Sequence, residues 1–328
     1  MNNSINELIK KIDGADKVYI QPHNMPDPDA IASSFALKEL LAKRKIPSNI
    51  IYMNEIERIN SIKMMEFFGI KMEIKDKEFT TNPKDYIILI DSQVGNSNLT
   101  SIEGNKIAVI DHHKDLENYE YDYKDIRPDI GACSTVIAQY YYQAEIEPSA
   151  EVATALLYGI MNDTNNLTRN TNQKDLDSFY WLYGIANLSK IKNLRMNEIG
   201  RQDLNAYAKA LENYEQYGSI GFVGIENCND SLLGTISDMV YKIEGTNIVV
   251  SYALRDDGIK FSVRSGVKEV NADDLVKFII DNRGVGGGHK EMAGGFVPVN
   301  ELDFLKNKQL DTYVRFRTIA FVEKKNIC

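Results

Sequence analysis

The stretch KIAVIDHH, from Lys106 to His113, decides the fold of this chain. Its residues Ile107–Ile110 are apolar and mostly β-branched, which is typical of a strand buried on both faces. The strand ends abruptly in one carboxylate and two imidazoles, Asp111, His112 and His113. Because ligands bind at the carboxyl ends of strands in open α/β sheets, we expect metal ligands or acid–base groups at this end.

Two upstream stretches have the same form, an apolar strand that ends in titratable side chains. Val18–Ile20 leads to His23, Asp27 and Asp29, and Tyr86–Ile90 leads to Asp91. Farther along, an apolar helix predicted over residues 150–160 leads to Asp163. Taken alone, each aspartate is also typical of a turn or a helix N-cap. Taken together, the strands are expected to place these groups at one edge of one sheet.

The distribution of histidine favours a functional site over scattered caps and turns. The chain contains four histidines. Three of them, His23, His112 and His113, follow predicted strands, and the fourth, His289, follows Gly286–Gly288.

Strands alternate with helices in the first part of the chain, which predicts a doubly wound, mainly parallel α/β sheet. We expect helices near residues 30–43, 58–68, 131–142 and 150–160, within a metal-binding domain over residues 1–195. A helical connector is expected at about 173–218. Residues 219–328 then predict a smaller α+β domain, in which Asp256-Asp257-Gly258 forms a hairpin turn between two strands.

The composition limits the class of protein. With 328 residues and a net charge of −9, the chain is long enough for two cores but lacks the basic surface that tracks duplex DNA or a long single strand. A small anionic substrate stays compatible, because bound divalent cations would reverse the charge of a carboxylate-lined site. The chain has three dispersed cysteines and no apolar run of roughly 18 residues, so we expect a cytoplasmic protein without membrane association. A homodimer stays open.

Six of these polar residues form a candidate ligand set of four carboxylates and two imidazoles: His23, Asp27, Asp29, Asp91, His112 and Asp163. The set is too large for one ion and suits two ions that share a carboxylate. Oxygen ligands mixed with imidazole nitrogen favour Mn²⁺, with Mg²⁺ or Co²⁺ as substitutes, and the cysteine positions exclude a cysteine-ligated zinc site. Two such ions suit hydrolysis at phosphorus, because together they activate water and stabilise the charge of an in-line displacement.

The same residues resemble a known family. H-x-x-x-D-x-D at His23–Asp29, the single Asp91, D-H-H at Asp111–His113, and Asp163 resemble, in order, the four motifs of the DHH phosphoesterase superfamily. Val263-Arg264-Ser265 and GGGHK at residues 286–290 resemble the substrate domain of its first subfamily. That subfamily includes oligoribonuclease/phosphoadenosine-phosphate phosphatases and cyclic-dinucleotide phosphodiesterases, whereas the pyrophosphatases of the second subfamily lack the GGGH segment. Where the family often has glycine, this chain has Ala32, Asn165 and Asn166.

The resemblance implies a role for each residue. One metal would be held by His23, Asp27 and Asp91, and the second by Asp29, Asp91, His112 and Asp163, with Asp91 bridging. His113 would contact the scissile phosphate or the leaving group, and Asp111 would orient an imidazole, so that Asp91, Asp111 and His113 form the catalytic set. In the second domain, Arg264, Ser265, His289 and the backbone N–H groups of Gly287 and Gly288 would bind the nucleotide.

The resemblance therefore implies a metal-dependent hydrolase of phosphodiester or phosphomonoester bonds in short oligoribonucleotides or small nucleotides. Adenosine 3′,5′-bisphosphate and linear or cyclic dinucleotides are the small-nucleotide candidates, and no residue decides among them. Two other interpretations stay open, a nucleotide-binding regulatory module that has lost its chemistry and a single-strand exonuclease. We expect the GGGH segment to form a substrate-binding loop, and it also has a purely structural interpretation, as a tight turn.

Overall fold

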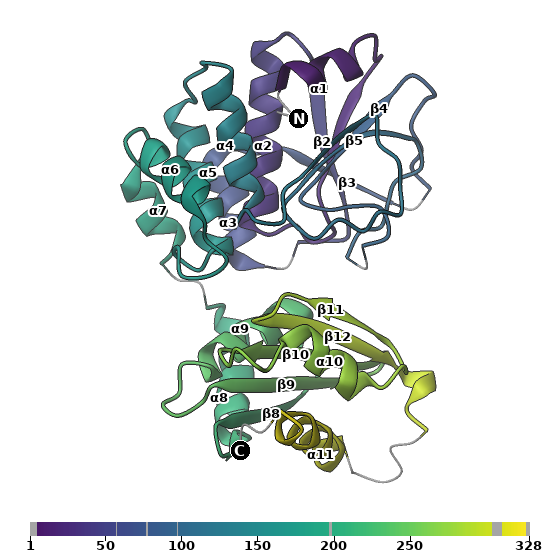
Figure 1. Ribbon diagram of the computed structural model, residues 1–328, viewed down its shortest axis with the longest axis vertical. Coiled ribbons are helices and arrows are strands. Elements are labelled where there is room, and N and C mark those ends of the chain that lie inside the picture. The colour runs from purple at the N-terminus through teal and green to yellow at the C-terminus, as the bar shows by residue number, and fades with distance from the viewer. Residues whose placement is uncertain are drawn as a thin grey trace. The chain divides into compact units, whose positions relative to one another are not determined.

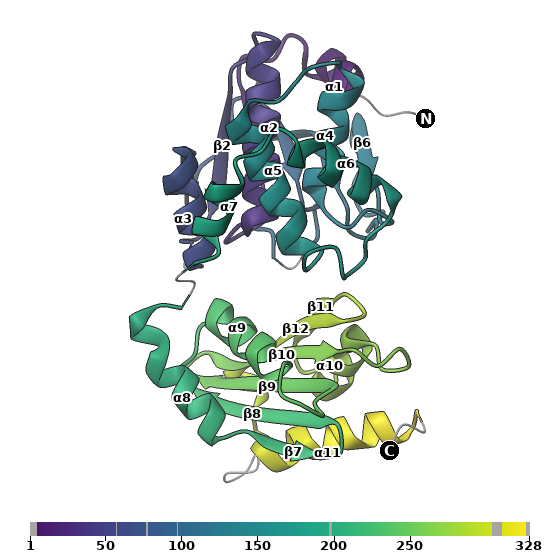
Figure 2. The same ribbon diagram turned by 90° about the vertical axis from the view of Figure 1, so that its left-hand side faces the viewer.

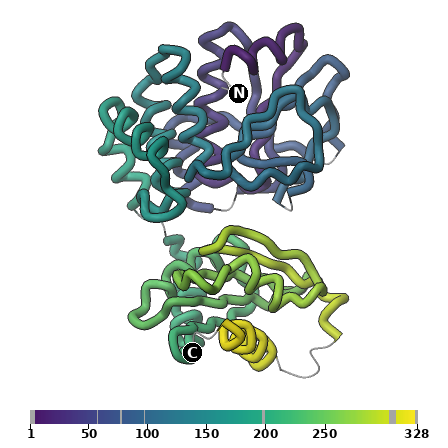
Figure 3. The backbone as a smooth tube through the Cα atoms, in the orientation of Figure 1, coloured from purple at the N-terminus to yellow at the C-terminus, as the bar shows by residue number. Residues whose placement is uncertain are grey.

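The computed structural model describes residues 5–56, 58–76, 78–96, 98–196, 199–303 and 310–325. The chain divides into two compact units, Met1–Glu198 and Ile199–Cys328 (Figure 1). It completes the first unit before it enters the second, as the colour gradient along the tube in Figure 3 shows. Each unit has its own sheet and its own apolar core.

The first unit is built on a sheet that has, over the described residues, six strands in the order β3-β2-β1-β4-β5-β6. These are β1 (Val18–Gln21), β2 (Ser48–Met53), β3 (Met72–Lys75), β4 (Tyr86–Ile90), β5 (Asn105–Asp111) and β6 (Tyr123–Ile126). Neighbouring strands are parallel, which confirms the predicted parallel sheet. The strand order reverses between β1 and β4, and ligands of open α/β sheets bind beside such a reversal.

The two faces of this sheet are covered by different kinds of structure. Alternate residues such as Ile20, Ile88 and Ile110 are buried in the core formed with the helices, which lie together on one side of the sheet in Figure 2. Leu89 and Val109 belong to a second apolar cluster. That cluster is covered by residues outside helices, namely Phe79, Val94, Leu99 and Tyr121. Because both faces are buried, β4 and β5 have unbroken apolar runs rather than alternating ones.

The helices of the first unit are α1 (Ile5–Ile12), α2 (Pro28–Lys43), α3 (Ile59–Phe68), α4 (Cys133–Gln143), α5 (Ala150–Asp163), α6 (Gln173–Tyr183) and α7 (Leu188–Leu194). α2 begins at a strong start signal, because Asp27 Oδ1 accepts hydrogen bonds from the N–H groups of Asp29 and Ala30 at 3.0 and 3.1 Å. Pro28, which has no N–H to satisfy, occupies the first turn.

The second unit contains a mixed sheet with, over the described residues, six strands in the order β11-β12-β10-β9-β8-β7. These are β7 (Glu215–Tyr217), β8 (Ile220–Glu226), β9 (Ile248–Arg255), β10 (Gly258–Ser265), β11 (Val285–Gly288) and β12 (Met292–Pro298). Only β8 and β9 pair in parallel among the described strands of this sheet. The predicted hairpin forms, since Arg255 of β9 pairs with Gly258 of β10.

Helices cover both faces of the second sheet. They are α8 (Leu204–Glu212), α9 (Asp230–Val240), α10 (Ala272–Ile280) and α11 (Leu310–Glu323), with the 3₁₀ turns η1 (Arg201–Asp203) and η2 (Val299–Glu301). α10 and α11 contribute to the core on one face, and α8 and α9 to the core on the other. The mixed sheet with its helices confirms the predicted α+β character of this unit. Across the described residues, no helix has the length and apolar character needed to cross a membrane.

The segment predicted as a helical connector, residues 173–218, is divided between the two units. α6 and α7 bury Leu182, Ile191 and Leu194 in the core of the first unit. α8 buries Tyr207 and Ala210 in a core of the second. These apolar side chains explain why α6 and α7 belong to the first unit and α8 to the second. Each helix packs its apolar face on the nearest sheet or helices.

The glycine-rich segment differs from its predicted form as a loop. Val285–Gly288 forms strand β11, which lies at the edge of the second sheet and pairs with β12. A Cβ atom on Gly286 would lie 2.7 Å from Ile280 Cδ1, and one on Gly295 of β12 would lie 2.3 Å from the same atom. The glycines therefore let this hairpin pack closely on α10. Glycine in a strand commonly marks such a close approach, and a sequence cannot distinguish it from a turn.

Helices α2, α4 and α5 approach one another at Gly159 of α5. A Cβ atom at Gly159 would lie 3.1 Å from the Cβ of Ala32 and 2.2 Å from Ser134 Oγ. It would also lie 3.1 Å from Oδ1 of Asp29. Gly159 therefore provides the room for Ala32, which stands where the resembling family often has glycine.

We expect Gly159→Ala to lower the free energy of unfolding by about 1–3 kcal/mol, the usual cost of an additional methyl group in a packed interior. Urea unfolding of the metal-free protein measures this change. Gly184→Ala is the control, because a Cβ atom there would meet its nearest neighbour, Trp181 O, at 3.6 Å. Equal stability of the two variants would contradict the close packing of the three helices.

Candidate metal centre

The predicted site residues of the first unit come together at the carboxyl ends of three neighbouring strands. β1 leads to His23, β4 to Asp91, and β5 to Asp111-His112-His113. These strands lie side by side in the order β1-β4-β5, so parallel geometry carries their polar ends to one edge. The starts and ends of helices add the remaining residues, because Asp27 and Asp29 lie at the start of α2 and Asp163 ends α5.

Asp91 lies between two imidazoles. Its Oδ2 is 3.7 Å from His23 Nε2, and its Oδ1 is 3.2 Å from His112 Nε2. The side chain is buried, and Oδ1 makes no hydrogen bond of acceptable geometry among the described residues. A buried carboxylate oxygen without a hydrogen bond is costly, and a cation is the partner that would satisfy it. The two oxygens face different histidines, which fits a carboxylate shared by two ions.

One group of ligand atoms comes from His23, Asp27 and Asp91, all within 4.8 Å of one another. Nδ1 of His23 lies 2.8 Å from the carbonyl oxygen of Asn24. Because a carbonyl can only accept, Nδ1 carries the hydrogen, and the lone pair is on Nε2, the nitrogen that faces Asp27 at 4.0 Å and Asp91.

A second group comes from Asp29, His112 and Asp163, again within 4.8 Å. His112 Nδ1 lies 3.2 Å from the carbonyl oxygen of Ile130, and its Nε2 lies 3.3 Å from Asp163 Oδ2. Asp29 accepts hydrogen bonds from the N–H groups of Cys133 and Ser134 at 2.7 and 2.9 Å. Cys133 and Ser134 are the first residues of α4, a helix that lacks a side-chain cap of its own. The N–H groups at the start of α4 therefore hold the Asp29 carboxylate in place.

The loop before β5 fixes the position of His23. The Asn24 N–H donates to the carbonyl of Asn98 at 2.8 Å, and Asn24 Nδ2 donates to Thr100 Oγ1 at 2.9 Å. Thr100 N–H returns a hydrogen bond to Asn24 Oδ1 at 3.0 Å. Neither Asn24 nor Thr100 follows a pattern in the sequence, because the two residues are 76 positions apart.

His113 and Asp111 form a separate pair beside the ligand groups. His113 Nδ1 lies 2.8 Å from Asp111 Oδ1. The same oxygen accepts from the backbone N–H of His112, and Oδ2 accepts from Gln93 Nε2 at 2.7 Å. The His113 side chain is 30% exposed, whereas Asp111 is fully buried. Asp111 is thus engaged in orienting His113, and Gln93, which sequence reasoning missed, holds Asp111.

Asp163 is held by a turn of unusual backbone. The three consecutive residues Asn165, Asn166 and Leu167 have φ values of 48°, 59° and 65°, in the left-handed region that asparagine tolerates better than most residues. This conformation explains why asparagine replaces the glycine common in the resembling family. Arg169, also missed from the sequence, donates from Nε to the Asp163 carbonyl at 3.0 Å and lies 3.5 Å from Oδ1.

Crowding of buried charges shifts the pKa values at this centre. Burial, with the charges of Asp91 and Asp163, raises the pKa of Asp29 well above 3.8, and burial raises that of Asp91. Burial alone would lower the pKa of His112, but the close contact with Asp91 and the charges of the nearby carboxylates raise it well above 6.5. Burial alone would raise the pKa of Asp111, but the hydrogen bond and charge of His113 lower it to about 2.

The predicted substrate residues of the second unit lie at β10, at β11 and in the turn after β11. The Arg264 guanidinium is largely buried and donates from Nε to Asp238 Oδ1 at 2.6 Å, with further bonds to Ser262 Oγ and the carbonyls of Val263 and Gly234. The Ser265 hydroxyl accepts from the Val267 N–H at 3.3 Å. Both side chains are therefore engaged within their own unit.

The edge strand sets which backbone groups of the GGGH segment face outward. The His289 N–H donates to the Met292 carbonyl at 2.7 Å. Because hydrogen-bonded pairs alternate along an antiparallel ladder, Gly287 bonds inward to β12 while the N–H groups of Gly286 and Gly288 point away from it. A Cβ atom on Gly288 would lie 2.4 Å from the Met292 oxygen, so glycine is required there.

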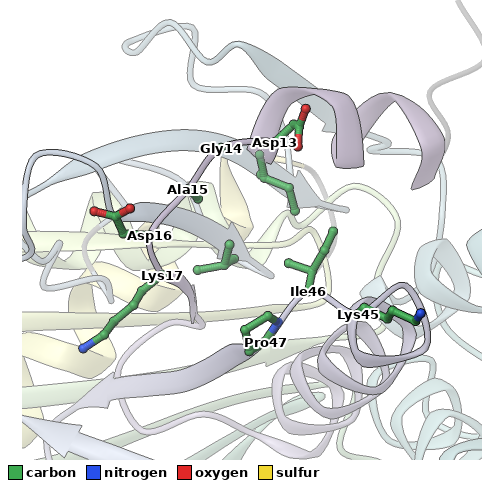
Figure 4. Close-up of a pocket in the computed structure, with 10 residues that line it drawn as sticks. Asp13, Gly14, Ala15, Asp16, Lys17, Lys45, Ile46 and Pro47 are labelled. Carbon is green, nitrogen blue, oxygen red and sulfur yellow. The ribbon is translucent and has the colours of Figure 1, made fainter.

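A cavity in the first unit lies away from the metal centre (Figure 4). It has a volume of about 180 Å³ and is lined by Ile12–Val18 and Lys45–Pro47. Val18 opens β1, whereas His23 follows the other end of the same strand. The cavity is therefore at the amino end of the sheet, and it does not include the predicted site residues.

The two units match two family models. Residues 17–160 match the DHH family, N-terminal domain, and residues 201–315 match the DHHA1 domain. The fold is similar to the crystal structure of an exopolyphosphatase-related protein from Bacteroides fragilis, with a TM-score of 0.76 over 98% of this chain and 96% of that one, at 20% identity.

The relatives of this chain among curated proteins include the following three. An uncharacterized protein of Methanocaldococcus jannaschii is 29% identical over 297 residues, which is 89% of this chain and 60% of that protein. The cyclic-di-AMP phosphodiesterase PdeA of Listeria monocytogenes is 25% identical, over 89% of this chain and 46% of that protein. A probable bifunctional oligoribonuclease and PAP phosphatase NrnA of Streptococcus mutans is 22% identical, over 88% of this chain and 91% of that protein. The chain spans about half the length of the first two.

We expect the metal-free protein to lose stability as the pH rises above the ordinary pKa values of these groups, 3.8 for Asp29 and Asp91 and 6.5 for His112. The pKa values of Asp29, Asp91 and His112 are raised in the folded state, so their contribution is complete at low pH and is lost as the pH rises through the folded-state values. Mn²⁺ requires deprotonated ligands, so its stabilising effect should grow over the same range. Thermal unfolding with EDTA and with Mn²⁺ measures both trends, and a metal-free protein that gains stability with pH would contradict the assignment.

Proposed function

This chain belongs to the DHH superfamily, and from that premise we propose that it is a dinuclear-metal phosphoesterase. Its substrates would be short oligoribonucleotides or small nucleotides, cleaved at a phosphodiester or phosphomonoester bond. The observation that carries the proposal is Asp91, whose two carboxylate oxygens face His23 and His112 separately. A structural aspartate at a strand end has no need of two imidazoles, one facing each of its oxygens.

The residues fit two ions that share Asp91. The first would be held by His23, Asp27 and Asp91, and the second by Asp29, Asp91, His112 and Asp163. This donor set of carboxylate oxygens and imidazole nitrogens favours Mn²⁺, with Mg²⁺ or Co²⁺ as substitutes. When bound, two such cations would act as Lewis acids that lower the pKa of water and stabilise negative charge on the phosphate.

His113 would donate a proton to the leaving oxygen. Asp111 holds the hydrogen on Nδ1, so proton exchange with the substrate falls to Nε2. Burial and the charge of His112 lower the pKa of His113, but the hydrogen bond and charge of Asp111 outweigh them, and the net pKa is raised above 6.5. A raised pKa favours the protonated imidazole, which is the form that a general acid requires.

The relatives support the choice of a nucleotide substrate. One is named a cyclic-di-AMP phosphodiesterase and another a probable oligoribonuclease and PAP phosphatase. The net charge of −9 argues against a groove that tracks a long strand, because such grooves are basic. A kcat/KM series over short oligoribonucleotides, adenosine 3′,5′-bisphosphate and linear and cyclic dinucleotides, with Mn²⁺, tests the proposal. No turnover of any of them with Mn²⁺, Mg²⁺ or Co²⁺ would favour a regulatory nucleotide-binding module.

In the second unit, we propose that the outward N–H groups of β11 and the side chain of His289 bind the nucleotide. Gly286 and Gly288 leave those N–H groups accessible, because no side chain shields them. The resemblance also assigns the N–H of Gly287 to the nucleotide, but this N–H bonds to β12. Arg264 and Ser265 stay predicted nucleotide ligands, although the bonds they already make point to a part in shaping β10.

Asp91→Ala and His113→Ala should separate metal binding from proton transfer. We expect Asp91→Ala to lose bound metal, because both ligand groups include this residue or face it. His113→Ala should keep its metal and lose about 10²–10⁴-fold in kcat, the usual range for a general acid. Metal analysis and kinetics measure both. Asp85→Ala is the control, since Asp85 is a buried aspartate just before the other end of β4. Loss of metal in His113→Ala but not in Asp91→Ala would overturn the roles.

His289→Ala should lower kcat/KM for nucleotides while metal content and thermal stability stay normal. The loss should be about 10-fold or more, as for one hydrogen bond to a charged group. Hydrolysis of bis-p-nitrophenyl phosphate, which has no nucleotide to bind, should change much less. Equal losses on the two substrates would contradict a nucleotide-binding role for the second unit.

A further inference from the structure

Negative charge is concentrated at the metal centre. Five carboxylates gather there, from Asp27, Asp29, Asp91, Asp111 and Asp163. Two divalent cations would offset four of these charges, and His113 and Arg169 already lie beside Asp111 and Asp163. A substrate phosphate would bring further negative charge to this site, so a cationic side chain that can reach the phosphate would favour its binding.

Arg58 is placed to supply this charge. It immediately precedes α3, and its Nη1 lies 3.9 Å from Asp27 Oδ2. That distance is an ion-pair contact but is too long for a hydrogen bond. Asp27 Oδ1 is already occupied by two N–H groups at the start of α2. The Arg58 side chain is 40% exposed, so most of its five N–H donors are not used by Asp27.

Contacts of α3 fix the position of Arg58 relative to both ligand groups. Arg58 faces Asp27 of the first group. Two residues later, Asn60 Nδ2 lies 3.5 Å from Oδ1 of Asn162, the neighbour of Asp163 in the second group. The start of α3 therefore lies beside both groups, within the first unit.

Two other arginines of the first unit have structural roles, because their guanidinium groups bond to acceptors of the protein. Arg127 donates from Nε and Nη2 to both oxygens of Asp125 at 2.7 Å, and from Nη1 to Gln139. Arg169 bonds to the backbone carbonyl of Asp163. Both are more buried than Arg58, with side-chain exposures of 17% and 18%. Among the described residues, the side chain of Arg58 has no polar contact other than the one with Asp27.

We propose that Arg58 is a substrate-binding residue, whose guanidinium binds a non-bridging oxygen of the substrate phosphate beside His23, Asp27 and Asp91. This proposal rests on the phosphoesterase function proposed above and adds a residue to it. The planar guanidinium can present two parallel N–H groups to phosphate oxygens, which lysine cannot do. The alternative is that Arg58 only neutralises Asp27, and in that case its loss should change metal affinity and not phosphate affinity.

Binding of inorganic phosphate to the Mn²⁺-loaded protein tests this proposal without relying on catalysis. Isothermal titration compares the wild type with Arg58→Gln and Arg58→Lys, and metal analysis gives the Mn²⁺ content of each. We expect Arg58→Gln to weaken phosphate binding by about 10–100-fold, the equivalent of one hydrogen bond to a charged group. Arg58→Lys should keep part of that affinity, and all variants should hold the wild-type amount of Mn²⁺.

Arg44→Gln is the matched control, because Arg44 is an exposed arginine at the other end of α2 from Asp27. It should bind phosphate as the wild type does. Unchanged phosphate affinity in Arg58→Gln, a fall in its Mn²⁺ content, or no phosphate binding by the wild type would overturn the proposal. If the wild type binds phosphate through Arg58 but hydrolyses no ester, the phosphoesterase function fails and the binding role of Arg58 stands.

Discussion

Repulsion among buried carboxylates is the constraint on which the first unit depends. Asp29, Asp91 and Asp163 are close enough to raise the pKa of Asp29, and the fold accepts this cost at the carboxyl ends of its central strands. Backbone N–H groups offset part of this cost, since two N–H groups at the start of α4 donate to Asp29. What they leave is the Asp91 oxygen without a hydrogen bond. A site with unsatisfied negative charge and ordered ligands is prepared for cations, because less reorganisation is needed when they bind.

The rings of His23 and His112 are oriented in the same way. In each ring, Nδ1 faces a backbone carbonyl, of Asn24 for His23 and of Ile130 for His112. Backbone carbonyls are positioned by the fold itself, so the tautomer that directs Nε2 to the carboxylates does not depend on another titratable side chain. His113 differs, because its Nδ1 faces Asp111. The hydrogen bond and charge of that carboxylate raise the pKa of the His113 ring, and they leave Nε2 for proton exchange.

The sequence predicts the parts of this site that are local and misses those that are not. Strand ends, the parallel sheet and the order of motifs follow from apolar runs and their terminal residues, as in Lys106–His113. Gln93, Asn24 and Arg169 act through contacts with residues that no periodicity connects to them, so no pattern reveals them. The glycine cluster was predicted as a loop and is strand β11, because the close approach to α10 that requires glycine depends on tertiary packing. Arg264 was predicted from its neighbours Val263 and Ser265, and its bond to Asp238 of α9 could not be seen in the sequence.

The structural and functional interpretations of the strand-end aspartates are not alternatives. Asp27 caps α2 through Oδ1 and faces Arg58 through Oδ2, and Asp29 holds the start of α4 while belonging to a ligand group. Each carboxylate has about four lone-pair sites, so one group can satisfy backbone N–H donors and still bind a cation. The N–H groups at the start of each helix thereby orient the carboxylate, and the carboxylate satisfies those N–H groups. Replacing either aspartate would remove a cap and a ligand together, so a loss of activity there could not be attributed to metal binding alone. His23 separates the two effects, because its ring accepts no hydrogen bond from a helix start and its only backbone partner is Asn24 among the described residues.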